Sequence, residues 1–537
     1  MYIHDNFIYY CKTNINRMKF QKRLLLICVL ASYFNVYAQK TAPGSTKRPN
    51  IIFILADDHA YQAISAYGSK LIKTPNIDRI AREGALMQSA YVTNSVCSPS
   101  RAVILTGKYS HLNGMKDNGT YFNGAQQTLP KIFKQYGYQT AIVGKWHLFS
   151  TPTGFDYWNI LPDQGNYYHP KFIKMGKDTM YSGYVTDIIT NLAINWIGDH
   201  KDKPFFLMLH HKAPHRNAMP PIKYLDKFND VKFPLPYSFY DDYKDKVGLQ
   251  RQSITIKNDL DIRYDSKIPC DTCPVTKINN WAPAEYQREL AGLTQEERAI
   301  WDKAYQKKYE LFKALHTKEE ITRFQYQRYM EDYLRCVMSL DDNVGRVLKY
   351  LGNNGLAKNT IVVYMSDQGF YLGEHGLYDK RFMYEESFRT PMMIRYPKVV
   401  KPGNKLNQFV LNLDIAPTLL DLAGIKPPDD MQGESMKRLL TKQPLVKKWR
   451  DEIYYHYYEL SFNLTAHYGI RTRQYALMHF YNPVDGWELY DLRKDPYEMT
   501  NVYNKPEYQQ VVTDLKTRLK ALQVKYKDEE STFLRKK

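Results

Sequence analysis

The sequence predicts a layered α/β domain with a mostly parallel sheet, followed by a smaller C-terminal α+β subdomain. Three observations support this expectation. Residues 50–56 form an uninterrupted apolar run, which is typical of a strand buried on both faces of a parallel sheet. Strand-like and helical segments then alternate over about 400 residues. Beyond about Pro428 the pattern changes to short strands that read as antiparallel.

The composition is that of a folded globular protein. The chain has 537 residues, of which 44% are hydrophobic and 24% charged, and these values exclude global disorder. No collagen period and no solenoid repeat is visible in the sequence. The formal net charge of +19 favours a polyanionic partner such as nucleic acid, anionic lipid or a sulfated or phosphorylated polymer. A basic proteome or a solvated basic surface explains the same charge equally well.

The N-terminus predicts an export signal. The apolar run from Leu24 to Phe34 is too short to span a bilayer, follows a cluster of basic residues, and precedes small residues near Ala38. Residues 1–38 are therefore interpreted as a signal peptide, with Met18 as the true start and residues 1–17 as an over-long gene prediction. We expect cleavage near Ala38, a periplasmic or secreted mature protein, and no stable membrane span.

The cysteines are too sparse for a disulfide scaffold, because four of the six lie beyond residue 38 in a long chain. Cys270 and Cys273 lie in a loop rich in proline and aspartate. In an oxidising compartment they either close a local disulfide or, as the weaker alternative, form half of a zinc site. Cys336 falls in a helical pattern and is expected in the core.

The elements of the large domain follow in chain order. Strands are expected at residues 50–56, 139–143, 205–210, 360–365 and 392–395. The first helix begins at Thr74-Pro75 and ends at Gly84, because proline favours the first turn and glycine the end. Further helices are expected at residues 187–197, 325–351 and 414–423.

Three parts are expected along the chain. They are the signal peptide at 1–38, the large α/β domain at 39–430 and the C-terminal α+β subdomain at 431–537. Within the large domain, residues 216–320 turn polar, first loop-like and then helical, and are interpreted as an insertion over one edge of the sheet. The C-terminal subdomain is expected to contain strands at 453–458, 468–471, 475–480 and 487–490, and a helix at 511–524.

Polar side chains follow four of the predicted strands. The four sets are Asp57-Asp58, Lys145-Trp146-His147, residues 210–215 and Asp367-Gln368. Ligands of open α/β sheets bind outside the carboxyl ends of the strands, so these sets are expected to meet. Three aspartates and a glutamine form an all-oxygen set, which suits Ca²⁺ or Mg²⁺ better than zinc. Helix capping or turn chemistry explains one Asp-Asp pair, but it does not explain four coordinated strand ends.

The run Cys97-Ser98-Pro99-Ser100-Arg101 is the sharpest single motif. A cysteine before a helix that starts with proline lies in the positive field of the helix N-terminus, where a nucleophile is activated. From the residues alone, Cys97 is either a thiol nucleophile or a buried cysteine.

This segment resembles the sulfatase signature C-x-P-x-R, and the resemblance extends across nearly the whole mature chain. It takes in the Asp-Asp pair, G-K-W-H at 144–147, K-A-P-H-R at 212–216 and S-D-Q-G…H-G…D-K-R at 366–381. The chain therefore resembles the type I, formylglycine-dependent sulfatases. The resemblance implies an alkaline-phosphatase-like fold, in which helices sandwich a large mixed, mostly parallel sheet, and makes residues 39–430 the catalytic domain.

In that family a dedicated maturation enzyme oxidises the signature cysteine to Cα-formylglycine, so Cys97 would not act as a thiol. The aldehyde would be hydrated to a gem-diol, and one hydroxyl would attack sulfur and give a covalent sulfo-enzyme. The resemblance implies Ca²⁺, or alternatively Mg²⁺, held by Asp57, Asp58, Asp367, Gln368 and the modified residue 97. The family most often has asparagine where this chain has Gln368, and both amides offer a carbonyl oxygen.

The other reactive positions of the family also have counterparts in this sequence. Arg101 and Lys145 would stabilise the developing negative charge by fixed electrostatics. His147 would accept the proton whose removal expels sulfate. His215 and Lys380 would contact the sulfate, and one of the two, left undecided by the sequence, would protonate the leaving sugar oxygen.

Four further residues are candidates for contact with the substrate. His375 and Arg381 lie in the same block as Lys380, although roles in stabilising a turn explain them equally well. His467 and Arg471 belong to the C-terminal subdomain and would have to extend into the cleft.

The leading functional interpretation is a secreted sulfuric-ester hydrolase that acts on sulfated carbohydrate, with no nucleic-acid partner. The blocks at 57–68, 211–217 and 367–376 look most like bacterial N-acetylglucosamine-6-sulfatases. This likeness implies exo-acting release of 6-O-sulfate from a terminal N-acetylglucosamine of glycosaminoglycan or mucin glycans. The alternatives are a formylglycine-dependent phosphodiesterase or phosphonate hydrolase, and a non-catalytic binder of anionic glycans.

Overall fold

The computed structural model describes residues 48–528 apart from 271 and 276. The chain divides into the units Met1–Arg48 and Pro49–Lys537, and the fold below is that of the second unit. The signal peptide predicted at residues 1–38 lies outside the described residues. Within the described part, no helix has both the length and the apolar character needed to cross a membrane.

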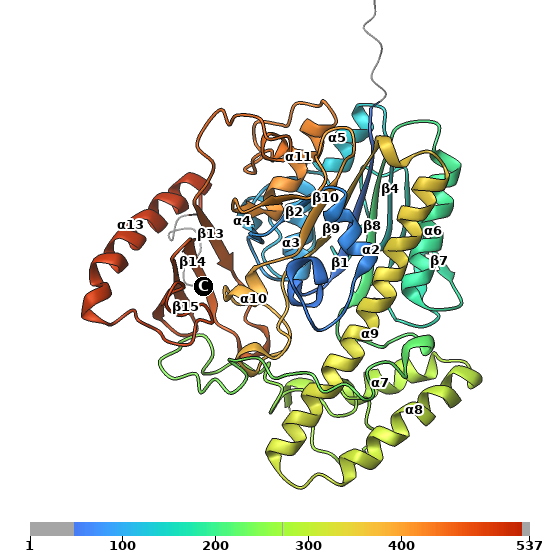
Figure 1. Ribbon diagram of the computed structural model, residues 1–537, viewed down its shortest axis with the longest axis vertical. Helices are drawn as coiled ribbons and strands as arrows, with labels where there is room; N and C mark the ends of the chain where they lie inside the picture. The colour runs from blue at the N-terminus through green and yellow to red at the C-terminus, as the bar shows by residue number, and fades with distance from the viewer. Residues whose placement is uncertain (1–47, 271, 276, 529–537) are drawn as a thin grey trace, which may run out of the picture. The chain divides into compact units, whose positions relative to one another are not determined.

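A ten-stranded mixed sheet forms the centre of the second unit (Figure 1). In spatial order its strands are β11 (Asn404–Leu406), β2 (Ala85–Met87), β10 (Met392–Arg395), β9 (Thr360–Ser366), β1 (Asn50–Asp57), β8 (Phe205–Pro214), β4 (Gln139–Lys145), β5 (Tyr157–Leu161), β6 (Lys171–Lys174) and β7 (Lys177–Met180). The central strands from β9 to β5 run parallel. Antiparallel pairs occur toward both edges.

Helices cover both faces of this sheet. One face packs against α2 (Pro75–Arg82), α6 (Val185–His200) and α9 (Lys318–Asn353), and the other against α3 (Cys97–Thr106), α5 (Leu129–Gln135) and α11 (Ile415–Leu422). Alternate residues of β1 pack against the helices on opposite faces of the sheet. Ile52 and Ile54 join the core beneath α6 and α9, whereas Ile51 and Phe53 join the core beneath α3. Because successive side chains of a strand point to opposite faces, an unbroken apolar run is buried on both sides.

Residues 216–320 contain no β-strand among those described. They form loops and two short 3-10 turns, followed by α7 (Ala282–Ala291) and α8 (Gln295–Lys313), which lie beside α9 in Figure 1. Trp301 and Tyr305 of α8 join the same core as α9. The loops include a disulfide between Cys270 and Cys273, so the first of the two sequence alternatives holds for this pair.

The C-terminal part contains a four-stranded antiparallel sheet. Its strands are β13 (Glu452–Tyr457), β14 (Ala466–Thr472), β15 (Tyr475–Asn482) and β16 (Gly486–Asp491), in that spatial order. The long helix α13 (Gln509–Tyr526) packs on this sheet through Leu515 and Leu519. The same apolar cluster includes residues of the large domain, so the two parts share one core.

The structure differs from the sequence expectation at several elements. β8 extends to Pro214, so that His210, His211 and Lys212 lie within a strand and not after it. The edge strand β7 and its neighbour β6 are short and largely exposed, and the sequence did not predict them. Cys336 is fully buried on α9, as predicted. The remaining elements are β3 (Ala90–Tyr91), β12 (Val410–Leu411), α4 (Ser110–Asn113), α10 (Glu385–Phe388) and α12 (Lys437–Leu440).

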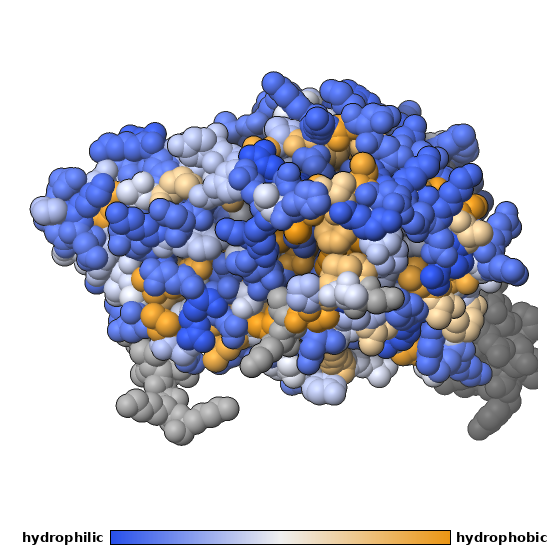
Figure 2. Space-filling view, turned by 90° about the horizontal axis from the view of Figure 1, so that it is seen from below, coloured by the Kyte–Doolittle hydropathy of each residue, from blue (hydrophilic) through white to orange (hydrophobic). Residues whose placement is uncertain are grey.

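The space-filling view shows a mostly hydrophilic face on which hydrophobic residues gather toward the middle (Figure 2). Among the described residues, the insertion contributes several large exposed aromatic side chains, including Tyr237, Tyr240 and Trp281. Exposed aromatic residues of this kind are enriched at binding surfaces.

Candidate active site

The carboxyl ends of four parallel strands meet at one edge of the large sheet. β1 ends at Asp57 and is followed by Asp58, and β9 is followed by Asp367 and Gln368. β4 ends at Lys145, and β8 leads to His215. The topology thus collects the side chains that the sequence singled out, at the place where open α/β sheets bind their ligands.

Three carboxylates form the floor of this site. One oxygen from each of Asp57, Asp58 and Asp367 lies within 4.8 Å of the other two, and all three residues are buried. Burial raises the pKa of Asp58 to about 6 and that of Asp367 to about 7. Burial also acts to raise the pKa of Asp57, but Lys145, His215 and Arg101 together hold it well below its usual value.

Two oxygens of this acidic cluster are available to a hard cation. Gln368 donates from Nε2 to Asp58, which leaves its carbonyl oxygen for another partner. Among the described residues, Asp57 Oδ1 and Gln368 Oε1 are buried without a hydrogen-bond partner. Buried carboxylate and amide oxygens that lack donors are suited to bind Ca²⁺ or Mg²⁺. Asp57, Asp58, Asp367 and Gln368 could therefore hold such an ion.

Basic side chains surround the carboxylates. Arg101 binds Asp367 through Nε at 3.1 Å and Nη2 at 2.9 Å, and it donates to the carbonyl of Lys145 at 2.9 Å. Lys145 donates to Asp57. Lys380 Nζ lies 2.6 and 2.7 Å from the two oxygens of Asp58. Burial acts to lower the pKa of Lys380, but Asp58 and its neighbours raise it well above the usual value.

Cys97 stands at the start of α3 and faces the carboxylates. Its sulfur lies within 4.8 Å of a carboxylate oxygen of Asp57 and a ring nitrogen of His215. The residue is 1% exposed, and this burial raises the pKa of the thiol to about 12. At neutral pH the unmodified side chain is therefore a protonated thiol, which is a weak nucleophile.

His147 contacts both α3 and the turn after β5. Its ring lies 3.3 Å from the hydroxyl of Ser98 and accepts a hydrogen bond from Gln164 at 2.9 Å. Burial and the charge of Lys145 lower the pKa of His147 to about 4, although Asp163 acts in the opposite direction. The imidazole is thus neutral at pH 7 and can accept a proton.

His215 has a defined tautomer. Its Nδ1 lies 2.5 Å from the carbonyl oxygen of Arg216, and because a carbonyl only accepts, Nδ1 carries the proton. Nε2 then faces Asp58 at 3.7 Å. Burial, followed by the charge of Lys145, lowers the pKa of His215 well below its usual value.

A pocket of about 570 Å³ opens above these groups. Its floor includes Asp58, Cys97, His215 and Lys380. Its walls come from the turn at residues 162–166, from the insertion and from the C-terminal part. The wall residues are Asn118, Pro162, Asp163, Gln164, Gly165, Asn166, Lys212, Arg216, Tyr264, Trp281, Glu285, Arg288, Glu289, Asp379, Arg381, Glu459 and Phe462.

The four expected substrate contacts fall into two groups. Arg381 lines the pocket, where it pairs with Glu459 at 2.9 Å. His375, His467 and Arg471 are not among the described residues that line it. His375 is fully buried and binds Asp241 at 2.6 Å.

The two candidates on β14 lie inside the interface between the C-terminal sheet and the large domain. His467 is fully buried among aromatic rings, and its Nδ1 contacts the carbonyl of Thr465 at 2.8 Å. Arg471 pairs with Glu385 at 2.7 Å. Residues 467 and 471 share one face of the strand, and this face packs inward, so neither side chain reaches the pocket.

Sequence reasoning missed several pocket residues, most notably Gln164. The signal that could have found it is the run Y-W-N-I-L at 157–161, an apolar strand followed by the polar turn P-D-Q-G. Because β5 pairs parallel with β4, its carboxyl end lies beside Lys145. Trp281 and Arg288 come from the insertion, and no strand-end rule points to them.

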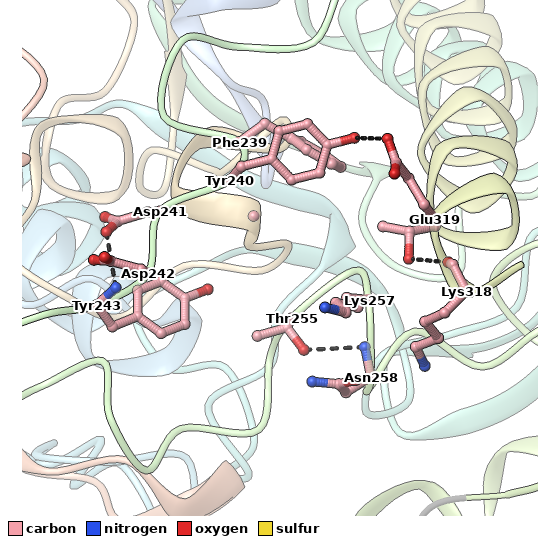
Figure 3. Close-up of a pocket in the computed structure, with 12 residues that line it drawn as sticks. Phe239, Tyr240, Asp241, Asp242, Tyr243, Thr255, Lys257, Asn258, Lys318 and Glu319 are labelled. Carbon is pink, nitrogen blue, oxygen red and sulfur yellow. Dashed lines mark hydrogen bonds between the residues drawn. The ribbon is translucent and has the colours of Figure 1, made fainter.

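A second cavity of about 820 Å³ lies between the insertion and the start of α9 (Figure 3). Figure 3 shows Asp241 and Asp242 on one side and Lys257, Asn258 and Lys318 on the other. Asp241 connects this cavity with the buried His375. None of the reactive residues predicted from the sequence is among the described residues that line it, so the first pocket is the candidate active site.

Comparisons with known proteins identify the family of this chain. The sulfatase family profile matches residues 49–425, and the profile "N-sulphoglucosamine sulphohydrolase, C-terminal" matches residues 373–525. An N-acetylglucosamine-6-O-sulfatase of Bacteroides thetaiotaomicron is 46% identical over 492 residues, which are 90% of this chain and 88% of that protein. Human N-acetylglucosamine-6-sulfatase is 26% identical, over 82% of this chain and 72% of the human protein.

Solved structures of sulfatase-like proteins also match this chain. A protein solved in complex with its substrate D-glucosamine-2-N,6-O-disulfate superimposes with a TM-score of 0.86 at 46% identity, over 90% of this chain and 99% of that one. The phosphonate monoester hydrolase of Agrobacterium radiobacter, at 20% identity and a TM-score of 0.64, covers 89% of this chain and 96% of that one and shows the shared fold alone. The predicted alkaline-phosphatase-like fold is confirmed, and the chain belongs to the sulfatase family, as a sulfuric ester hydrolase.

Proposed function

We propose that this sulfatase removes 6-O-sulfate from N-acetylglucosamine, or N-substituted glucosamine, at the end of a glycosaminoglycan or mucin glycan. The observation that carries this proposal is the 46% identity, over nine-tenths of the chain, to an N-acetylglucosamine-6-O-sulfatase. The solved relative with D-glucosamine-2-N,6-O-disulfate adds support. A primary 6-O-sulfate projects away from the sugar ring and can enter a deep polar pocket of this kind.

The acidic floor fits the divalent cation that the family generally uses. Asp57, Asp58, Asp367 and Gln368 would hold the ion, because they are buried and Asp57 Oδ1 and Gln368 Oε1 lack a hydrogen-bond partner among the described residues. A hard cation suits this oxygen set, and we propose Ca²⁺. When bound, it would supply positive charge next to the sulfate oxygens.

We propose that a maturation enzyme converts Cys97 to formylglycine. The supporting observations are the C-x-P-x-R sequence at the start of α3 and the raised pKa of the unmodified thiol. Once formed, the hydrated aldehyde would supply the hydroxyl nucleophile for sulfur, with the sugar oxygen as the leaving group. The export signal at residues 1–38, and delivery to the periplasm or outside, belong to the same proposal.

The surrounding residues position charge and protons. Arg101 and Lys145 are fixed by Asp367 and Asp57, so their positive charges are already in place when negative charge develops on the sulfuryl group. His147 is neutral and close to the start of α3, and it would accept a proton from the hydroxyl group of residue 97.

The leaving sugar oxygen needs a proton from another residue of the pocket. Lys380 and His215 both line the pocket. Lys380 keeps its proton at neutral pH, whereas His215 must first gain a second proton on Nε2. The negative charge of a bound sulfate would favour that protonation. We propose that one of these two residues donates the proton.

The test is a panel of defined glucosamine, galactosamine and uronic acid derivatives that are sulfated at single positions, with desulfation followed by chromatography. We expect a clear preference for 6-O-sulfated N-acetylglucosamine at a chain end. A preference for 2-O-sulfated uronic acid, for 4-O-sulfated galactosamine or for internal sites would refute the proposed specificity. A sulfate and a phosphate ester of one chromogenic alcohol, assayed side by side, test the phosphonate or phosphodiester hydrolase alternative.

A further inference from the structure

One face of α7 lies along the mouth of the active-site pocket. Trp281 immediately precedes the helix, and Trp281, Glu285, Arg288 and Glu289 all line the pocket. Their spacing of four, seven and eight positions from Trp281 places them on one side of a helix. The insertion thus contributes a continuous helical surface to a site whose reactive groups all come from elsewhere.

Trp281 is held in a fixed orientation with part of its ring exposed. Its Nε1 donates to the carbonyl of Ile278 at 3.1 Å, and its ring meets the ring of Tyr264 edge to face at 5.0 Å. The guanidinium of Arg216 lies 5.4 Å from the centre of the indole. The side chain nevertheless remains 40% exposed at the pocket mouth. A large aromatic ring that is already ordered loses little entropy when a ligand covers it.

Arg216 packs against the aromatic rings around Trp281 and fixes their positions. Its guanidinium makes two hydrogen bonds to the carboxylate of Asp265, both of 2.7 Å, and lies over the rings of Tyr378 at 4.8 Å and Tyr264 at 5.5 Å. A bidentate arginine–carboxylate pair is strong and directional. Because Asp265 already neutralises its charge, Arg216 serves to hold the aromatic wall and is less suited to bind an anionic substrate.

Arg288 contributes a positive charge to the same face of α7. Its side chain is 69% exposed and pairs with Glu285 three positions earlier, in an exposed ion pair of a kind that contributes little to stability. Arg288 can therefore exchange this partner for a sulfate or carboxylate, which its planar guanidinium binds through two parallel hydrogen bonds.

We propose that the α7 face is a subsite for the glycan beyond the 6-O-sulfate, in which Trp281 stacks against a pyranose ring and Arg288 binds a second anionic group. That group is either an N-sulfate on the same sugar or the carboxylate of a neighbouring uronic acid. The C–H bonds on one side of a pyranose form an apolar surface that matches an aromatic ring. This proposal rests on the proposed function, because it assigns the part of the same substrate that lies outside the catalytic floor.

The experiment compares Trp281→Ala and Arg288→Gln with two matched controls, Tyr240→Ala and Arg298→Gln. Tyr240 is a 57% exposed aromatic residue at the second cavity, and Arg298 is an exposed arginine on α8 that pairs with Asp302. For each protein, kcat/KM is measured on three substrates. They are 6-O-sulfated N-acetylglucosamine, N,6-O-disulfated glucosamine, and a disaccharide in which a uronic acid follows the 6-O-sulfated glucosamine.

We expect Trp281→Ala to lower kcat/KM on the disaccharide about tenfold more than on the monosulfated sugar. If Arg288 binds an N-sulfate, Arg288→Gln should lower kcat/KM on the disulfated sugar about five- to tenfold more than on the monosulfated sugar. If Arg288 binds the uronate, the same additional loss should appear on the disaccharide. If both variants keep the substrate ratios of the controls, the subsite is refuted while the sulfatase specificity stands. If the unaltered enzyme acts on none of the three substrates, the proposed function fails and the subsite assignment fails with it.

Discussion

Gln164 donates a hydrogen bond from its side-chain amide to Nε2 of His147 over 2.9 Å, while its carbonyl oxygen accepts from Lys145. The ammonium of Lys145 can only donate, so it fixes which way the amide points. The amide N–H group then faces the imidazole and favours its unprotonated state. Gln164 thus connects the two basic residues and holds His147 as a neutral imidazole, with the proton on Nδ1 and the lone pair of Nε2 toward the amide.

Replacement of Gln164 by glutamate is expected to shift the acidic limb of the pH–rate profile upward. Burial, followed by Lys145, holds the pKa of His147 at about 4, so in the unaltered enzyme this histidine stays neutral down to about pH 5. A carboxylate at position 164 would stabilise the imidazolium and raise this pKa by about one to two units. Activity that needs neutral His147 would then fall at a higher pH, as measured by kcat between pH 4 and 8.

The matched control is Gln443→Glu, which adds the same charge at an exposed position outside the pocket. It should leave the profile unchanged. Gln164→Ala should lower kcat about tenfold, which corresponds to about 1.4 kcal/mol, and should change KM less. An acidic limb that does not move in Gln164→Glu would contradict the role assigned to this contact.

Cys97→Ala is expected to abolish turnover and leave the fold intact. The substitution removes one buried sulfur, and the loss of such a small group should lower the free energy of unfolding by only about 1 kcal/mol. Cys97→Ser should be similarly inactive, because a serine hydroxyl has no geminal partner to help expel sulfate. Activity and circular dichroism are measured on each variant, and mass spectrometry of the peptide that contains residue 97 detects the modification. More than trace turnover in well-folded Cys97→Ala would contradict the formylglycine mechanism.

The buried strands of the large sheet could be predicted because their sequence pattern follows directly from their environment. A strand covered by helices on both faces is apolar at successive positions, as residues 51–56 are. Polar residues directly after such strands then locate the carboxyl edge of the sheet, so the sequence alone predicts that Asp57, Asp58, Asp367 and Lys145 lie together. The same pattern is absent from the edge strand β7 and its neighbour β6, which are short and largely exposed.

The positions of two candidate histidines, His375 and His467, could not be predicted from the sequence. His375 and His467 are fully buried, and their Nδ1 atoms contact Asp241 and Thr465, which are not among the described residues that line the active-site pocket. Nothing in the sequence separates a buried histidine of this kind from one that faces substrate, because the difference depends on long-range packing. Trp281 was missed for the same reason, since its place at the pocket depends on Arg216, which is 65 positions away in the sequence.

Removal of divalent cations is expected to abolish activity, and added Ca²⁺ to restore it. The buried oxygens of Asp57, Asp58 and Asp367 repel one another, and a bound cation relieves this repulsion only in the folded state. Ca²⁺ at about 100 times its Kd would add about 2.7 kcal/mol to the free energy of unfolding, which calorimetry would detect as a rise in Tm. Asp367→Asn should lose both the Tm response and the activity, whereas the exposed control Asp429→Asn should keep them. An unchanged rate after exhaustive chelation would rule out the metal site.

The end of the described chain carries a buried carboxylate that should make stability depend on pH. Asp528 accepts hydrogen bonds from His456 at 2.7 Å, from Tyr454 at 2.9 Å and from Tyr458 at 3.0 Å, and it lies 3.1 Å from His111. Burial acts to raise the pKa of Asp528, but the hydrogen bonds with His111 and His456 outweigh it and hold the pKa far below the usual value.

Asp528→Asn should therefore lower the free energy of unfolding at pH 7 by about 2–4 kcal/mol, because the amide cannot replace the charge-assisted hydrogen bonds. A carboxylate whose folded-state pKa is depressed stabilises the fold fully above its unfolded pKa of about 3.9, and the stabilisation fades as the pH falls below that value. The gap in stability between the two proteins should thus be constant from pH 5 to 7 and narrow below about pH 4. Denaturant unfolding at each pH measures this gap, with the exposed Asp514→Asn on α13 as the matched control. A gap that is absent at pH 7, or that widens in acid, would show that Asp528 does not stabilise the fold as a charged group.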